Sequence, residues 1–148
     1  MTVYDTARPY AAAYVLLERD GKVACVKRVN TGWMDGYYGL PSGKVEKGEG
    51  FLAAAVREVK EEVGVNVAPQ DLEFVSAFWR CEADDSEMEW VDILFRANTW
   101  EGEPYNAEPH VHSEIAWLDL SNLPDTVIPS LKKMLESAQE HLGYGEIR

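Results

Sequence analysis

The stretch that decides the fold spans residues 43–65 and reads GKVEKGEGFLAAAVREVKEEVGV. Apolar side chains recur in it at the spacing of one helix face, at Leu52, Val56, Val59 and Val63. Gly64 follows at a position where a left-handed cap ends many helices. The pattern predicts a helix over Gly50–Val63, with an apolar stripe that packs against a core.

The same helix carries a cluster of three glutamates. Glu58, Glu61 and Glu62 are spaced i, i+3 and i+4, so we expect them to lie together on a side that faces out of the core. Like charges at this spacing cost about 0.2–0.5 kcal/mol per pair unless something positive neutralises them. Arg57 reaches Glu61 at i+4, but one guanidinium cannot balance three carboxylates. Either a solvated acidic face or a site for a hard cation such as Mg²⁺ explains the cluster.

The residues around the cluster favour the cation site. Gly43, five spacers, Glu49, seven spacers, Arg57-Glu58, an aliphatic, one spacer, Glu61-Glu62, one spacer, Gly64 and an aliphatic form a pattern that resembles the Nudix box at every defining position. Leu40–Glu46 resembles that family's loop into the helix, with Ser42 in place of a glycine. The resemblance implies an α/β fold, the Nudix-type α/β/α sandwich with a mixed β-sheet. It makes 1–148 a single Nudix hydrolase domain with its box at 43–65.

The resemblance also assigns site residues. The carbonyl of Ser42 and the carboxylates of Glu58, Glu61, Glu62 and Glu108 are the expected ligands of Mg²⁺, with Mn²⁺ as an alternative ion. Arg57 holds Glu61, and the catalytic base is Glu61, Glu108 or, from its useful pKa range, His112. The expected phosphate contacts are Lys44 and Arg28.

The segment Trp100-Glu101-Gly102-Glu103-Pro104, followed after three spacers by Glu108, resembles the MutT-like subgroup. This favours water attack on the phosphorus of a (deoxy)nucleoside triphosphate, which releases NMP and pyrophosphate. ADP-ribose, dinucleoside polyphosphate or nucleotide-sugar hydrolysis and a non-catalytic nucleotide-binding module are the alternatives. The purine-contacting asparagine of MutT-type enzymes is missing before Pro129, which argues against oxidised guanine as substrate. Aromatic side chains that could stack on a base are Trp33, Tyr37, Phe78 and Trp90.

Charge and composition narrow the class of partner. The net charge is −12, and between Glu61 and Asp125 sixteen acidic residues face only two basic ones, Arg80 and Arg96. Such a surface repels nucleic-acid polymers, so we expect a small nucleotide partner. No apolar run approaches the roughly 18 residues of a membrane span, so we expect a cytoplasmic protein without a membrane partner. Cys25 and Cys81 make no disulfide framework, and a homodimer is plausible from family habit alone.

Alternating and β-branched runs predict the remaining elements. The expected strands are Tyr10–Glu18, Lys22–Val29, Leu72–Arg80, Met88–Ala97 and Glu114–Leu118. Asn30–Pro41 is expected to be a loop, and Glu82–Glu87 an acidic turn. Pro129 opens a second predicted helix, closed by Gly143, whose apolar face is Leu131, Leu135, Ala138 and Leu142.

Overall fold

The computed structural model describes residues 5–82 and 88–148. Its strands are β1 (Tyr10–Arg19), β2 (Lys22–Arg28), β3 (Tyr38–Gly39), β4 (Ser42–Lys44), β5 (Glu73–Cys81), β6 (Glu89–Ala97), β7 (His112–Asp119) and β8 (Tyr144–Ile147). The helices are α1 (Phe51–Val63) and α2 (Pro129–Gln139), and a short 3₁₀ turn spans Pro69–Asp71. No helix of the described ranges is long and apolar enough to cross a membrane.

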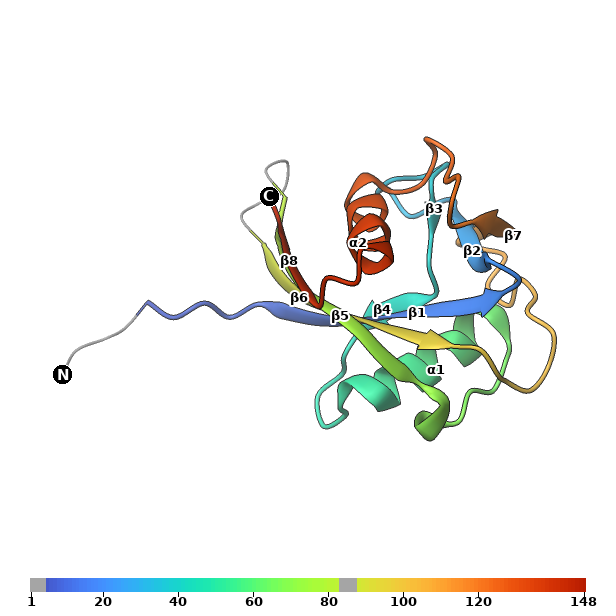
Figure 1. Ribbon diagram of the computed structural model, residues 1–148, viewed down its shortest axis with the longest axis horizontal. Coiled ribbons are helices and arrows are strands. Elements are labelled where there is room, and N and C mark those ends of the chain that lie inside the picture. Colours follow the sequence, from blue (N-terminus) through green and yellow to red (C-terminus); the bar gives the residue numbers. More distant parts are fainter. Residues whose placement is uncertain (1–4, 83–87) are drawn as a thin grey trace.

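The strands form a mixed sheet between two helical layers. Its order is β3-β2-β1-β6-β5-β8, with β4 added beside β1 and β7 beside β2. The β1–β6 and β5–β8 pairs are parallel, and the other pairs are antiparallel. Figure 1 shows α1 below the sheet and α2 above it. The predicted α/β/α sandwich with a mixed β-sheet is confirmed.

Alternation along β1 divides the core between the two helical layers. Val15 and Leu17 belong to the cluster that buries α1 through Val59 and Val63. Leu16 lies between them in sequence and joins the opposite cluster, under Leu131, Leu135 and Ala138 of α2. Successive side chains of a strand point to opposite faces, so a central strand must be apolar on both. Cys25 is buried in the α2 cluster and packs there as an apolar residue.

The sheet opens beside β1, and this opening positions the site. β1 and β2 pair only near their turn, through Glu18–Val23 and Arg19–Lys22. Beyond that point β4 pairs with residues 12–14 of β1, while β3 pairs with residues 26–27 of β2. The chain between the two short strands therefore crosses from one part of the sheet to the other, and it lines a space on the α2 side.

Several expected details of the elements are wrong. Leu52 is 43% exposed, because the buried face of α1 runs through Ala54, Ala55, Val59 and Val63 instead. The second helix ends at Gln139, and Leu142 is exposed, since the chain leaves the helix to form β8, which no expectation included. The predicted loop Asn30–Pro41 contains β3. Most of the acidic turn Glu82–Glu87 lies outside the described residues.

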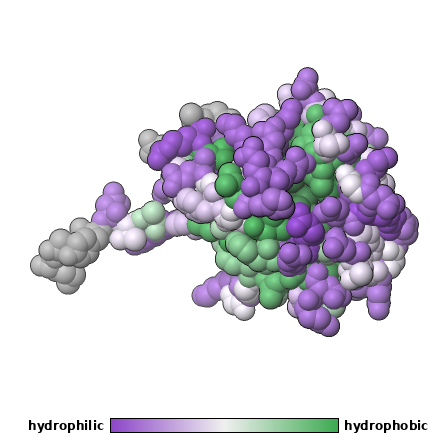
Figure 2. Space-filling model, in the orientation of Figure 1, coloured by the Kyte–Doolittle hydropathy of each residue, from purple (hydrophilic) through white to green (hydrophobic). Residues whose placement is uncertain are grey.

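Most of the surface in view is hydrophilic (Figure 2). Hydrophilic side chains cover most of the face shown in Figure 2, and hydrophobic ones show mainly in its middle. The exposed large apolar side chains are scattered over different elements, at Tyr10, Leu52, Phe74, Tyr105, Leu142 and Tyr144.

Two leucines test the assignment of the core. Leu16→Ala should lower the free energy of unfolding by about 2–5 kcal/mol, because it empties a site that is 1% exposed. The same change at Leu52, which is 43% exposed, should cost less than about 1 kcal/mol. Urea denaturation of both variants measures the difference. Equal losses would mean that the predicted stripe, and not the structure, describes the buried face of α1.

Candidate active site

The three glutamates of α1 do not face outward together. The Glu61 side chain is 52% exposed, whereas that of Glu58 is 13% exposed and lies against β4. A side chain at Gly43 would bring its Cβ to 2.1 Å from Glu58 Oε1, so only glycine leaves room for this carboxylate. Glu62 Oε2 accepts a 3.1 Å hydrogen bond from the Ser42 N–H. The expectation of one outward cluster is thus wrong, because β4 packs over two of its three members.

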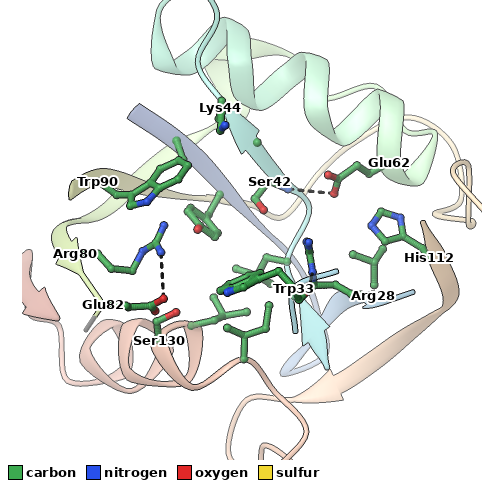
Figure 3. Close-up of a pocket in the computed structure, with 18 of the residues that line it drawn as sticks. Arg28, Trp33, Ser42, Lys44, Glu62, Arg80, Glu82, Trp90, His112 and Ser130 are labelled. Carbon is green, nitrogen blue, oxygen red and sulfur yellow. Dashed lines mark hydrogen bonds and ion pairs between the residues drawn. The ribbon is translucent and has the colours of Figure 1, made fainter. Parts of the chain in front are cut away.

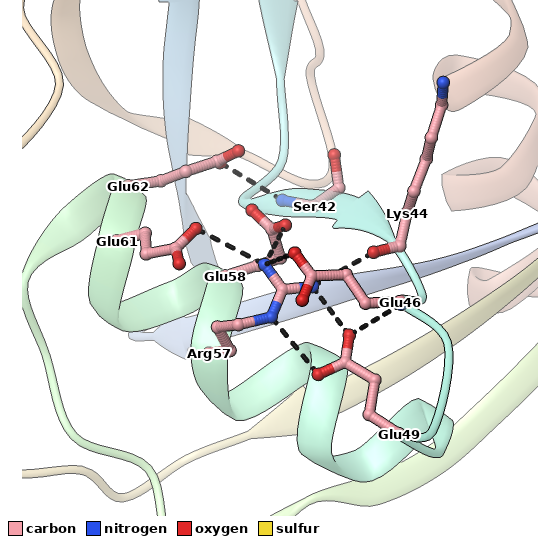
Figure 4. Close-up of polar contacts among 8 residues, drawn as sticks. All are labelled: Ser42, Lys44, Glu46, Glu49, Arg57, Glu58, Glu61 and Glu62. Atoms are coloured by element: carbon pink, nitrogen blue, oxygen red, sulfur yellow. Dashed lines mark hydrogen bonds and ion pairs between the residues drawn. The ribbon is translucent and has the colours of Figure 1, made fainter.

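Arg57 ties the segment before α1 to the helix (Figure 4). Its guanidinium donates to both carboxylate oxygens of Glu49, at 3.2 and 2.7 Å, and to the Lys44 carbonyl at 3.0 Å. Nη1 lies 2.7 Å from Glu58 Oε1 and 3.4 Å from Glu61 Oε2. The predicted Arg57–Glu61 contact is present, but the closest partners are Glu49 and Glu58. Arg57 is therefore the residue that orients this group of carboxylates.

Glu58 and Glu62 are partly buried without enough positive charge nearby to balance their carboxylates. Burial raises the pKa of Glu58, an effect that Arg57 opposes and that the charges of Glu61 and Glu108 reinforce. Burial raises the pKa of Glu62 further, and the neighbouring Glu58 carboxylate adds to the effect. The pKa of Glu49 is instead lowered, because its hydrogen bonds from Arg57 stabilise the ionised form. Glu58 and Glu62 would both gain from a cation beside them.

The donor set suits a hard divalent ion. Carboxylate oxygens and a backbone carbonyl are the ligands that Mg²⁺ accepts. In residues 5–82 and 88–148, however, no three His, Cys, Asp or Glu side chains converge closely enough to hold an ion without rearrangement. Arg57 takes Oε1 of Glu58, so only the other oxygen of that carboxylate is open to a metal in this arrangement. The chemical type of the ligands therefore fits the ion, although their present arrangement is not a closed cage.

A second segment brings Glu108 to this end of α1. The N–H groups of Tyr105 and Ala107 donate to the carbonyls of Val63 and Glu62, each at 3.1 Å. These bonds satisfy carbonyls that the end of a helix leaves unpaired. Glu108 then lies near enough for its charge to raise the pKa of Glu58 and Glu62. The structure thus brings together the box glutamates and Glu108, far apart in sequence, while their roles as ligands or base stay predictions.

A cavity of about 370 Å³ begins beside Glu62 and occupies the opening of the sheet (Figure 3). Arg28 and His112, which are cross-strand neighbours on β2 and β7, line the end near Glu62. Arg28 Nε donates to the Trp33 carbonyl at 2.8 Å, and the guanidinium lies over the Trp33 ring. Burial and the nearby Arg28 charge lower the pKa of His112. The uncharged imidazole is therefore favoured there.

The aromatic candidates separate into two groups. Trp33 and Trp90 line the cavity and can contact a ligand. Phe78 is 1% exposed and packs with Met134 and Ile147, so the expectation that it stacks on a base is wrong. Tyr37 packs against the α2 cluster and is not part of the lining. Of the two expected phosphate contacts, both Arg28 and Lys44 line the cavity, Lys44 with its ammonium group over Tyr10 and Trp90.

At the far end of the cavity the sequence pointed to Trp90, but it gave no role to Arg80 and Ser130, which line the same end. Arg80 is buried against Asp92. One signal was available, because Arg80 is one of two basic residues between Glu61 and Asp125. A fully buried acidic residue is unusual, and a buried ion pair often stabilises a fold no better than apolar residues of similar size would.

A family model described as "NUDIX domain" matches residues 7–138. The chain belongs to the Nudix hydrolase family. Nudix hydrolases generally use divalent metal ions and act on small nucleotide substrates. As a Nudix pyrophosphohydrolase, this enzyme has its box on β4 and α1, as the spacing from Gly43 to Val65 predicted.

Individual relatives carry different activities in their names. The chain is 30% identical over 128 residues to an RNA pyrophosphohydrolase of Pelagibacter ubique, covering 77% of this chain and 78% of that protein. It is 32% identical to an ADP-ribose pyrophosphatase of Methanocaldococcus jannaschii (78% and 65%) and 27% identical to the 8-oxo-dGTP diphosphatase of Escherichia coli (83% and 95%).

A crystal structure of a MutT Nudix hydrolase from Burkholderia pseudomallei superposes with a TM-score of 0.79 at 28% identity, covering 88% of this chain and 98% of that one. These similarities establish the family and the fold of the chain, and the names of the relatives cover several different classes of substrate.

Removing the guanidinium of Arg57 should destabilise the Nudix box. Arg57→Gln leaves Glu49 and Glu58 without their charged partner, and should lower the free energy of unfolding by about 1.5–3 kcal/mol. Arg96→Gln is the matched control, because among residues 5–82 and 88–148 Arg96 pairs with a single, partly exposed carboxylate, that of Glu18, and its loss should cost under about 1 kcal/mol. Urea titration of the two variants measures this. Similar losses would contradict the role of Arg57 as the hub of the box.

Proposed function

We propose that this chain, acting as one Nudix domain, hydrolyses a (deoxy)nucleoside triphosphate to NMP and pyrophosphate with Mg²⁺, which Mn²⁺ can replace. The observation that carries this proposal is that Glu62 lines an aromatic-lined cavity, while Glu58 packs against Gly43, which lines the same cavity. The carboxylates supply the ion site, and the cavity supplies room for a nucleoside. ADP-ribose, dinucleoside polyphosphates, nucleotide sugars and RNA with a 5′-triphosphate are the competing substrates.

Each residue of the site has a distinct task in this proposal. Glu58, Glu62 and the Ser42 carbonyl hold the ion, and Arg57 orients Glu58. When bound, the ion neutralises phosphate oxygens and lowers the pKa of a coordinated water. Arg28 and Lys44 contact the phosphates from the cavity side, where their charges offset the acidic surroundings.

The general base is one of two carboxylates that also serve as ligands. Glu61 is exposed and only loosely paired with Arg57, at 3.4 Å, so it can turn toward a water molecule. Glu108 approaches the same end of α1 from the opposite segment. The His112 side chain is buried, and the main-chain N–H of His112 donates a hydrogen bond to the Glu108 carbonyl. His112 therefore helps to position Glu108. Single Gln substitutions at Glu61 and Glu108 assign the base through the pH dependence of kcat, because loss of the base removes its acid limb, whereas loss of a ligand raises the Mg²⁺ concentration that activity requires.

The acidic surface supports a small substrate over a polymer. A chain with a net charge of −12 gains little from the phosphates of a long RNA, since polymer binding depends on release of counterions by basic residues. A nucleoside triphosphate needs only the local charges of the ion, Arg28 and Lys44. The name of the Pelagibacter relative nevertheless makes RNA with a 5′-triphosphate a necessary member of any substrate panel.

A panel of nucleotides tests the function directly. With Mg²⁺, release of pyrophosphate from a nucleoside triphosphate should exceed turnover of the other substrates, and EDTA should abolish it. Glu58→Gln and Glu62→Gln should each lower kcat by on the order of 100-fold, because each removes an ionised ligand. Glu73→Gln, on the exposed side of β5, is the control and should leave kcat unchanged. Wild-type turnover in both box variants would show that the mechanism is wrong.

A further inference from the structure

The end of the cavity away from Glu62 contains a charged pair that the hydrolytic chemistry does not use. Arg80 on β5 lines this end and is 7% exposed, while its partner Asp92 on β6 is fully buried. Figure 3 shows Arg80, Trp90, Glu82 and Ser130 at one end of the cavity, and Glu62, Arg28 and His112 at the other. A site that binds phosphates at Glu62 would extend the rest of its ligand toward Arg80.

The strand register explains how Arg80 is held. Arg80 lies directly opposite Trp90, and Asp92 lies opposite Phe78, so all of these side chains share the α2 face of the sheet. Arg80 Nε donates to Asp92 Oδ2 at 2.7 Å, and Nη2 donates to Oδ1 at 3.4 Å. The guanidinium also lies over the Trp90 ring, at 4.9 Å from its centroid. A two-point bond and a stacked ring together set the plane and direction of the guanidinium.

The charges at this end do not favour a second phosphate. Arg80 is the basic group here, and it faces two acidic ones, Asp92 at 2.7 Å and Glu82 at 3.7 Å. Two carboxylates already balance this guanidinium, so no excess of positive charge is left to attract an anion. The walls beside them are apolar or aromatic, and they include Trp33, Ile128 and Leu131. A flat, uncharged ring with a polar edge suits these surroundings.

From this geometry we propose that Arg80, oriented by Asp92, reads a carbonyl oxygen on the edge of the nucleobase, so that the enzyme prefers guanine, cytosine, uracil or thymine nucleotides to adenine nucleotides. The inference rests on the proposed function for the reaction itself. A guanidinium has only donors, and a carbonyl oxygen accepts from it. Adenine has no carbonyl. Its ring nitrogens accept one hydrogen bond, but the amino group beside N1 and N7 would place a donor against the second N–H of the guanidinium fork. A buried site built to bond one group rejects a ligand that lacks it.

Substrate selectivity is the first test. With Mg²⁺, kcat/KM for the best of GTP, CTP, UTP and dTTP should exceed that for ATP by on the order of 10- to 100-fold. Arg80→Lys keeps the charge but loses the planar fork, and should reduce this ratio to within a few fold of one. Arg96→Lys, at the partly exposed pair with Glu18 and outside the cavity lining, is the control and should keep the wild-type ratio. Equal or better turnover of ATP by the wild type, or an unchanged ratio in Arg80→Lys, would overturn the proposal.

Binding without hydrolysis separates this inference from the proposed function. Guanosine, cytidine, uridine, thymidine and adenosine carry no phosphate, so their binding in EDTA needs neither the ion nor turnover. The best carbonyl-bearing nucleoside should change the intrinsic tryptophan fluorescence, to which Trp33 and Trp90 in the cavity contribute, at concentrations about 10-fold lower than adenosine, and Arg80→Lys should remove this difference. If nucleosides discriminate but no nucleotide is hydrolysed, the base subsite stands and the proposed function fails. If adenosine binds as well as the best of them, the subsite proposal fails whatever the hydrolysis assay shows.

Folding of the variants is checked independently. Asp92→Asn keeps the shape of the partner but weakens its hold on Arg80. Asp92→Asn should lower the selectivity ratio while the unfolding midpoint in urea shows a folded protein. If Arg80→Lys fails to fold, a folded Asp92→Asn variant with the full wild-type ratio contradicts the proposal.

Discussion

The separation of β1 from β2 is the constraint on which the rest of the structure depends. The two strands leave their turn as a pair and then part, so their facing N–H and carbonyl groups need other partners. β4 supplies them for β1 and β3 for β2, which forces residues 38–44 to cross the opening. The cavity, the backbone of Ser42 and the close approach of Gly43 to Glu58 all follow from that crossing.

The same crossing explains why the carboxylates of α1 become chemically useful. A glutamate on a solvated helix face keeps an ordinary pKa and attracts nothing in particular. β4 removes water from Glu58 and Glu62, and their raised pKa reports the missing positive charge. Arg57 compensates part of this and, by binding Glu49 and the Lys44 carbonyl, holds β4 in place. One network of hydrogen bonds therefore both orients the carboxylates and holds the loop that packs over them.

The cavity is polar at both ends and apolar between them. One end collects Glu62 and Arg28 beside the helix, and the other contains the Arg80–Asp92 pair between two central strands. Burying such a pair is costly, and a pair of apolar residues would serve folding at least as well. The position of the Arg80–Asp92 pair beside Trp90 is better explained by ligand recognition than by stability. In our proposal, the central strands of this Nudix domain therefore bind the ligand together with its box.

The spacing of Gly43 to Val65 determined the family, the α1 helix and the identity of the acidic residues, because box spacing and helix periodicity are local properties of the chain. Sequence also located β1, β2, β5 and β6 to within a residue or two. Only the tertiary structure decided that Leu52 is exposed and that Glu58 and Glu62 are partly buried while Glu61 is not, since these depend on where β4 packs. The parallel strand β8 and the contact of Arg80 with Asp92 were equally inaccessible, because strand pairing between distant segments sets both.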